Sequence, residues 1–110
     1  MNLELVSKME VFQMMTVREI LNQFDVKLNL TDELMDIKIN DNEFQSHYMG
    51  KYKNEDVHVF EKKFMFDGCE ATRKVIINPE KQILISRVES NKIFRNITTH
   101  YNKYGEIIAI

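Results

Sequence analysis

Two turn signals inside a stretch of alternating apolar and polar residues limit what this chain can fold into. The Asp-Gly pair at residues 67–68 favours a type I′ hairpin turn, because both central positions of that turn need a positive φ. The Asn-Pro-Glu-Lys run at residues 78–81 is typical of a type I turn, with Asn first and Pro second. The segments beside these turns are therefore predicted to form neighbouring antiparallel strands, at residues 57–66, 71–77 and 83–88.

The same strand pattern extends over the rest of the chain from about residue 36. The further predicted elements are a strand at 36–39, a turn at 40–42, a returning strand at 44–52, a strand at 93–101, a turn at 102–105 and a last strand at 107–110. Turns every 8–12 residues, with no second long helical pattern between the strands, favour an antiparallel meander over parallel βαβ units.

The start of the chain has the pattern of a helix rather than a strand. Thr16 and Glu19 form a capping-box pattern, in which a hydroxyl and a carboxylate bind each other's end amides. The apolar residues that follow have the spacing of one helical face: Val17, Ile20, Leu21 and Phe24. Upstream apolar residues continue that face, so residues 3–24 are predicted to form one helix, or a short piece and a longer one. Thr31, with Asp32 and Glu33, is predicted to cap a further short turn through Leu34 and Met35.

These patterns predict a single α+β domain that occupies residues 1–110. Its helical part lies in residues 3–24 or extends to 34, and its antiparallel strands lie in residues 36–110. We expect an N-terminal helix packed on one face of a curved antiparallel β-meander, and seven or more strands would let the sheet curl into a partial barrel. A chain of 110 residues that is 44% hydrophobic buries enough surface for one core.

Composition argues against a membrane or secreted protein. No apolar run exceeds the four residues at 107–110, so no membrane span is expected. The N-terminus lacks the apolar region of a signal peptide. The single cysteine, Cys69, cannot form an intrachain disulfide, and a cytoplasmic location is expected.

Catalytic and metal-binding patterns are absent or have a simpler explanation. The candidate metal ligands have none of the short spacings of known metal motifs: His47, His58, His100 and Cys69. Glu61 and Lys63 form the E-x-K half of a metal-dependent nuclease signature, which needs a further acid such as Asp41 or Asp56. With 11 Glu and 11 Lys in 110 residues, about one E-x-K is expected by chance. The chain is therefore predicted not to be an enzyme, and no metal or cofactor is expected.

An interaction surface is the leading functional prediction. Met14 and Met15 are adjacent, so they cannot both lie on the apolar stripe of the helix, and Val11 also lies off it. A helix that is apolar on more than one face is covered by the sheet or by a second partner. We expect a small non-enzymatic module that binds a protein partner, or itself as a homodimer. The surface would be the N-terminal helix, with Val11, Met14 and Met15, or an open sheet edge such as 107–110.

The uneven distribution of charge along the chain supports an alternative function, the binding of nucleic acid. Residues 1–46 hold four basic and nine acidic residues, a balance of −5, whereas residues 47–110 hold eleven and eight, a balance of +3. The segment 87–104 interleaves cations with aromatic rings, as sheet surfaces that bind single-stranded nucleic acid do. The alternative is a nucleic-acid-binding accessory protein that uses Arg87, Lys92, Arg95, His100, Tyr101, Lys103 and Tyr104. A third possibility, by analogy of fold alone, is a carrier of apolar ligands lined by Phe60, Phe64 and Phe66.

Overall fold

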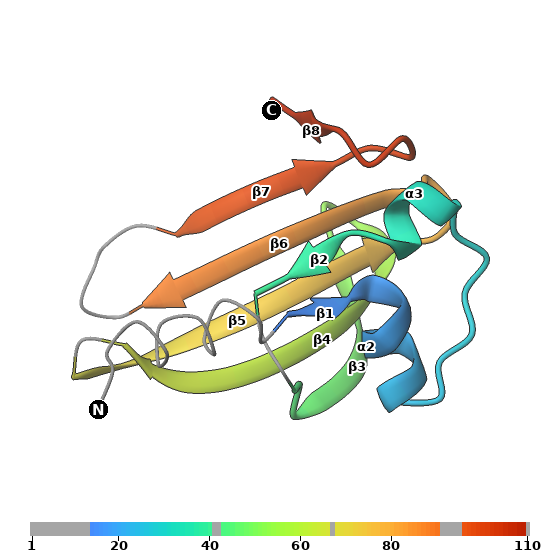
Figure 1. The fold of residues 1–110 in the computed structure, drawn as a ribbon. Coiled ribbons are helices and arrows are strands. Elements are labelled where there is room, and N and C mark those ends of the chain that lie inside the picture. The colour runs from blue at the N-terminus through green and yellow to red at the C-terminus, as the bar shows by residue number, and fades with distance from the viewer. Residues whose placement is uncertain (1–13, 41–42, 67, 91–95, 110) are drawn as a thin grey trace, which may run out of the picture.

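The computed structural model describes residues 14–40, 43–66, 68–90 and 96–109 (Figure 1). Six antiparallel strands form one sheet in chain order: β3 (Ser46–Tyr52), β4 (Glu55–Phe66), β5 (Cys69–Asn78), β6 (Ile83–Ser90), β7 (Ile97–Tyr101) and β8 (Ile107–Ile108). A separate pair of short strands is formed by β1 (Met15–Thr16) and β2 (Lys38–Ile39). The predicted combination of a short N-terminal helix with an antiparallel sheet is confirmed, but the sheet does not close into a barrel.

The helices are short and have the predicted caps. In α2 (Val17–Gln23), the Thr16 hydroxyl accepts from the Glu19 amide at 3.2 Å, and the Glu19 carboxylate accepts from the Thr16 amide at 3.0 Å. In α3 (Asp32–Met35), the Thr31 hydroxyl accepts from the Leu34 amide. A single helix over residues 3–24 is wrong, because Met15–Thr16 form β1 and α2 begins only after this cap. Residues 3–13 lie outside the described part of the chain.

The sequence predicts that residues 44–52 return beside the strand at 36–39, and this pairing is wrong. β2 pairs with β1 rather than with β3, and the Val17 amide donates to the Ile37 carbonyl at 2.9 Å beside this pair. The Gln23 side chain binds both backbone groups of Phe44. The Phe44 amide donates to Gln23 Oε1 at 3.1 Å, and Gln23 Nε2 donates to the Phe44 carbonyl at 2.5 Å. These contacts direct the chain from β2 past α2 before β3 begins.

The three hairpin turns of the central strands differ in sequence. Phe66 pairs with Cys69, as the predicted two-residue hairpin requires, and Gly68 has a φ of 76°. At the next turn the Lys81 amide donates to Asn78 Oδ1 at 3.0 Å, as the Asn-Pro pattern predicts. The turn between β3 and β4 consists of Lys53 and Asn54, both with positive φ, and no glycine marks it in the sequence.

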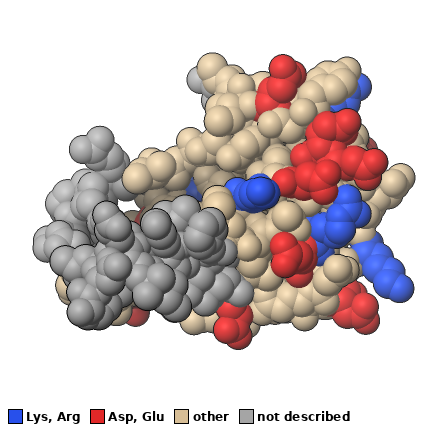
Figure 2. Space-filling view, viewed as in Figure 1, with Lys and Arg blue, Asp and Glu red and all other residues tan. Residues whose placement is uncertain are grey.

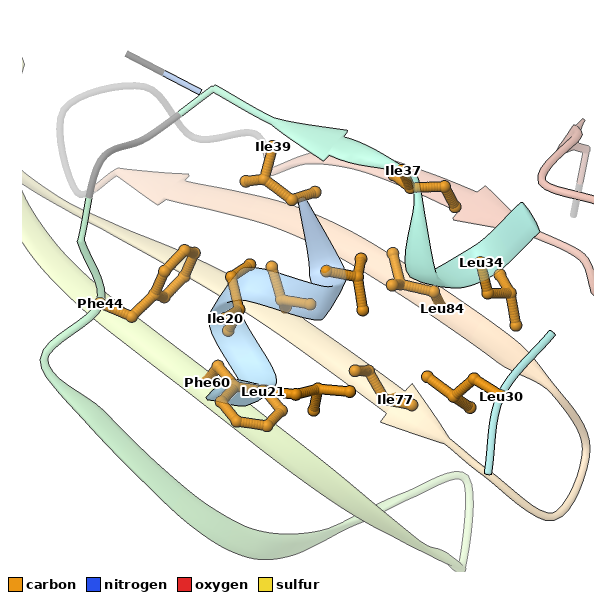
Figure 3. Packing of buried hydrophobic residues seen from close by; sticks show 12 residues of the cluster. Ile20, Leu21, Leu30, Leu34, Ile37, Ile39, Phe44, Phe60, Ile77 and Leu84 are labelled. Atoms are coloured by element: carbon orange, nitrogen blue, oxygen red, sulfur yellow. The ribbon is translucent and has the colours of Figure 1, made fainter. Parts of the chain in front are cut away.

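The main core lies between one face of the sheet and the layer formed by α2, α3 and the β1–β2 pair (Figures 1 and 3). We call this the helix-side face. The fully buried residues of this core are Val17, Ile20, Leu34, Phe44, Phe60, Val75, Ile77 and Leu84. Along the strands, the buried residues of this face alternate with residues on the opposite face, which we call the far face. A smaller apolar cluster lies there, made of Val57, Val59, Ile76 and Ile85.

Candidate functional site

The edge strand β3 presents the longest open edge of the described sheet. It has seven residues and pairs only with β4 among the described strands, whereas the other edge strand, β8, has two. Two large side chains of β3 are unusually accessible: Tyr48 is 41% exposed and Met49 is 57% exposed. An accessible edge of this length is a template for pairing with another strand.

The ladder between β3 and β4 fixes which backbone groups face outward. Tyr52 pairs with Glu55 across a two-residue turn, and at the other end the Gln45 amide donates to the Glu61 carbonyl at 2.9 Å. Hydrogen-bonded and non-hydrogen-bonded pairs alternate along an antiparallel ladder. The residues that direct their amides and carbonyls away from β4 are therefore His47, Met49 and Lys51.

A pair of histidines lies on the helix-side face of these two strands. His47 Nε2 and His58 Nδ1 are 3.0 Å apart, and the rings stack with centroids separated by 5.2 Å. His47 also stacks on Phe60 at 4.7 Å, and Phe24 lies beside both rings. Burial lowers the pKa of His58, and the charge of His47 lowers it further. Because one ring nitrogen must donate and the other accept, this contact requires that at least one of the two imidazoles is neutral.

A row of half-buried charged side chains crosses the far face. Tyr48 donates its hydroxyl to Glu61 at 3.2 Å, and Lys74 lies 3.9 Å from Glu61 and 3.8 Å from Glu89. Arg87 continues the row at 3.5 Å from Glu89. Burial, and after it the Glu61 carboxylate, raises the pKa of Tyr48, so its hydroxyl stays protonated as the donor. Two cations and two carboxylates balance each other in this row.

The residues predicted for an N-terminal interface differ in their environment. Met14 precedes β1 and is 42% exposed, whereas Met15 lies in β1, pairs with Ile39 and packs against the core. Neither residue lies on a helix, because Thr16 caps α2 after them. Val11 lies outside the described residues.

The described members of the predicted nucleic-acid surface do not lie on one face. Arg87 and His100 are on the far face, and Arg87 is engaged by Glu89 and by Thr98 Oγ1, which accepts from Nε at 3.3 Å. Tyr101 is on the helix-side face and packs against the core. Lys103 and Tyr104 lie in the β7–β8 turn, with the ammonium 5.2 Å from the ring centroid. Lys92 and Arg95 lie outside the described part, and nucleic-acid binding stays a prediction.

The remaining candidate groups are also dispersed. Glu61 and Lys63 share the far face of β4 as predicted, but Asp56 lies on the other face and pairs with Lys51 at 2.6 Å; Asp41 lies outside the described residues. Within the described ranges, no three His, Cys, Asp or Glu side chains lie close enough to hold a metal ion. Phe60 is fully buried in the core and Phe64 is half-buried on the same face, while the Phe66 side chain is not described.

The far face also has a cleft that sequence patterns did not indicate. Its lining includes Lys53 of the β3–β4 turn, Ile76 of β5, Ile85 of β6 and His100 of β7. The cleft has a volume of about 180 Å³. No signal in the sequence joins these residues, because they come from four separate elements that only the twisted sheet brings together.

None of the helices in the described part is long and apolar enough to cross a membrane. Comparison with known protein families, curated proteins and solved structures finds no match to this chain.

Proposed function

We propose that this chain is an interaction module, with no catalytic role, that pairs with a strand of another polypeptide at the open edge of β3. The observation that carries the proposal is the exposure of Tyr48 and Met49 on a seven-residue edge strand. Strand addition supplies affinity through backbone hydrogen bonds and specificity through side chains on alternate faces. Because Cys69 is the single cysteine, a reducing compartment such as the cytoplasm suits the module.

A second copy of the same chain is the occupant that the edge fits best. An antiparallel pair of β3 strands centred on Tyr48 sets the two Tyr48 rings opposite each other, with His47 opposite Met49 and Ser46 opposite Gly50. The outward backbone groups of His47 and Met49 then bond across the new pair. Aromatic cross-strand pairs stabilise sheets, and no like charges stand opposite each other in this register. A register centred on Met49 is less favourable, because it places His47 opposite Lys51.

The proposal is tested by the solution mass of the protein over a range of concentrations, with hydrogen exchange measured on the same samples. We expect a reversible dimer in which the amides of His47 and Met49 become protected. Met49→Pro removes an amide that points away from β4, so it leaves the internal ladder intact while blocking the edge. The dissociation constant should rise at least about tenfold, which corresponds to about 1.4 kcal/mol.

A control variant distinguishes an interface at the edge of β3 from an interface at the N-terminal surface. Met14→Glu adds a charge at an exposed residue before β1 and should leave the dimer unchanged. A dimer lost in Met14→Glu but kept in Met49→Pro would move the interface to the N-terminal side. A wild-type chain that stays monomeric at every concentration, with unprotected edge amides, would contradict pairing between two copies.

A further inference from the structure

The cleft on the far face has an apolar floor and a polar rim. The floor is formed by Val57, Ile76 and Ile85, which are only 2–6% exposed. The rim includes Lys53 from the β3–β4 turn and His100 from β7. Cavities of about 150 Å³ hold a molecule the size of benzene, so a volume of about 180 Å³ suits a ring with one small polar group.

His100 is the polar side chain of this cleft that has no partner among the described residues. Only 8% of the residue is exposed, and its ring makes no hydrogen bond or ion pair with any described residue. The ring nitrogens of His100 are not among the fully buried atoms that lack a partner, so they are accessible from the cleft that the residue lines. An accessible imidazole beside an apolar floor is a candidate for binding a ligand through a hydrogen bond.

The charges around His100 favour an anion. Burial lowers the pKa of His100, and the positive charges of Lys53 and Arg87 lower it further. Arg87 does not line the cleft and is paired with Glu89, and on the rim Lys81 is paired with Glu55, whose carboxylate lies 2.6 Å away. Lys53, in contrast, makes no ion pair with the described residues, and its ammonium lies 5.6 Å from the centroid of the Tyr52 ring. One uncompensated cation thus stands beside a neutral imidazole.

We propose that this cleft binds a small monocarboxylate whose remainder is an aromatic ring or a short alkyl chain. The carboxylate accepts from the His100 ring and from the Lys53 ammonium, which are the charge-assisted contacts that a carboxylate favours. The ring or chain covers Val57, Ile76 and Ile85 and removes their remaining exposed surface from water. This site uses the far face and does not depend on the proposed pairing at the edge of β3.

The experiment is a titration of the isotopically labelled full chain with benzoate, followed by the amide and histidine ring signals in NMR spectra. We expect saturable shifts at His100 and Lys53 with a dissociation constant of about 0.1–1 mM, the range for a ligand of nine heavy atoms. Benzamide has the same shape without the charge and should bind at least about tenfold more weakly. Hexanoate tests whether an alkyl chain replaces the ring. Equal binding of benzoate and benzamide would overturn the proposal.

Substitutions then identify the groups that hold the carboxylate. Lys53→Met removes the cation from an exposed turn and should weaken benzoate binding about tenfold without affecting folding, and His100→Gln tests the second contact. Lys51→Met is the matched control, because Lys51 lies nearby on β3 but pairs with Asp56 on the other face. Full affinity in folded Lys53→Met, or an equal loss in Lys51→Met, would also overturn the assignment, as would the absence of any saturable shift.

Discussion

The contact between His47 and His58 makes stability depend on pH at the scale of single residues. His58 has its ordinary pKa of 6.5 in the unfolded chain and a lower pKa in the folded chain, first because of burial and then because of His47. Between these two values the unfolded state binds more protons, so stability rises with pH. The contribution is fully present above about pH 6.5 and is lost as the pH falls through the folded pKa of His58.

We therefore expect the free energy of unfolding in urea to decrease between pH 7.5 and pH 5. His58→Gln removes the titrating ring and should make this decrease smaller. His100 also has a lowered pKa, from burial and then from Lys53 and Arg87, so a second part of the decrease should disappear in His100→Gln. An unchanged pH profile in His58→Gln would show that the histidine pair does not couple protonation to folding.

At the scale of elements, the Gln23 side chain joins the end of α2 to the segment before β3. It makes two hydrogen bonds to the backbone of Phe44, a residue that is 1% exposed. Gln23→Ala leaves both backbone groups without their partner, so we expect a loss of about 1–3 kcal/mol in the free energy of unfolding. Asn22→Ala, at an exposed neighbour on the same helix, should cause no comparable loss. Equal urea midpoints for Gln23→Ala and the wild type would contradict this role.

Elements marked by local turn chemistry could be predicted, and elements fixed by distant contacts could not. Gly68 and Asn78 mark their turns in the sequence, and both hairpins are present. The turn at Lys53 and Asn54 was not predicted, because its positive φ values occur without a glycine. The β1–β2 pair was missed for another reason: two-residue strands have no periodicity, and this pair depends on chain segments more than 20 residues apart.

At the scale of the whole molecule, an acidic patch and the cleft lie on opposite sides of the sheet. Acidic side chains gather on the visible face over the end that carries α3 (Figure 2), where Arg18 lies 3.7 Å from Asp32 and 3.3 Å from Asp36. The cleft with Lys53 and His100 lies on the far face. Sequence alone could not show which side of the sheet carries the cleft, because Val59 and Phe60 are both apolar and give β4 no clear inner face.

The same separation predicts different costs for two isoleucines in neighbouring strands. Ile77 is fully buried between the sheet and the helices, whereas Ile85 is 4% exposed and lines the open cleft on the far face. Ile77→Ala leaves a closed cavity in the main core, so we expect a loss of about 3 kcal/mol in the free energy of unfolding.

Ile85→Ala leaves a space that water enters from the cleft, so only the transfer part of the cost applies and the loss should be about 1–2 kcal/mol. Urea unfolding of both variants without added ligand gives the comparison. Equal losses would mean that a further layer covers Ile85 in solution, and the far face would then be an internal surface rather than a binding surface. Unequal losses in the expected order would leave the cleft open to a ligand from solvent.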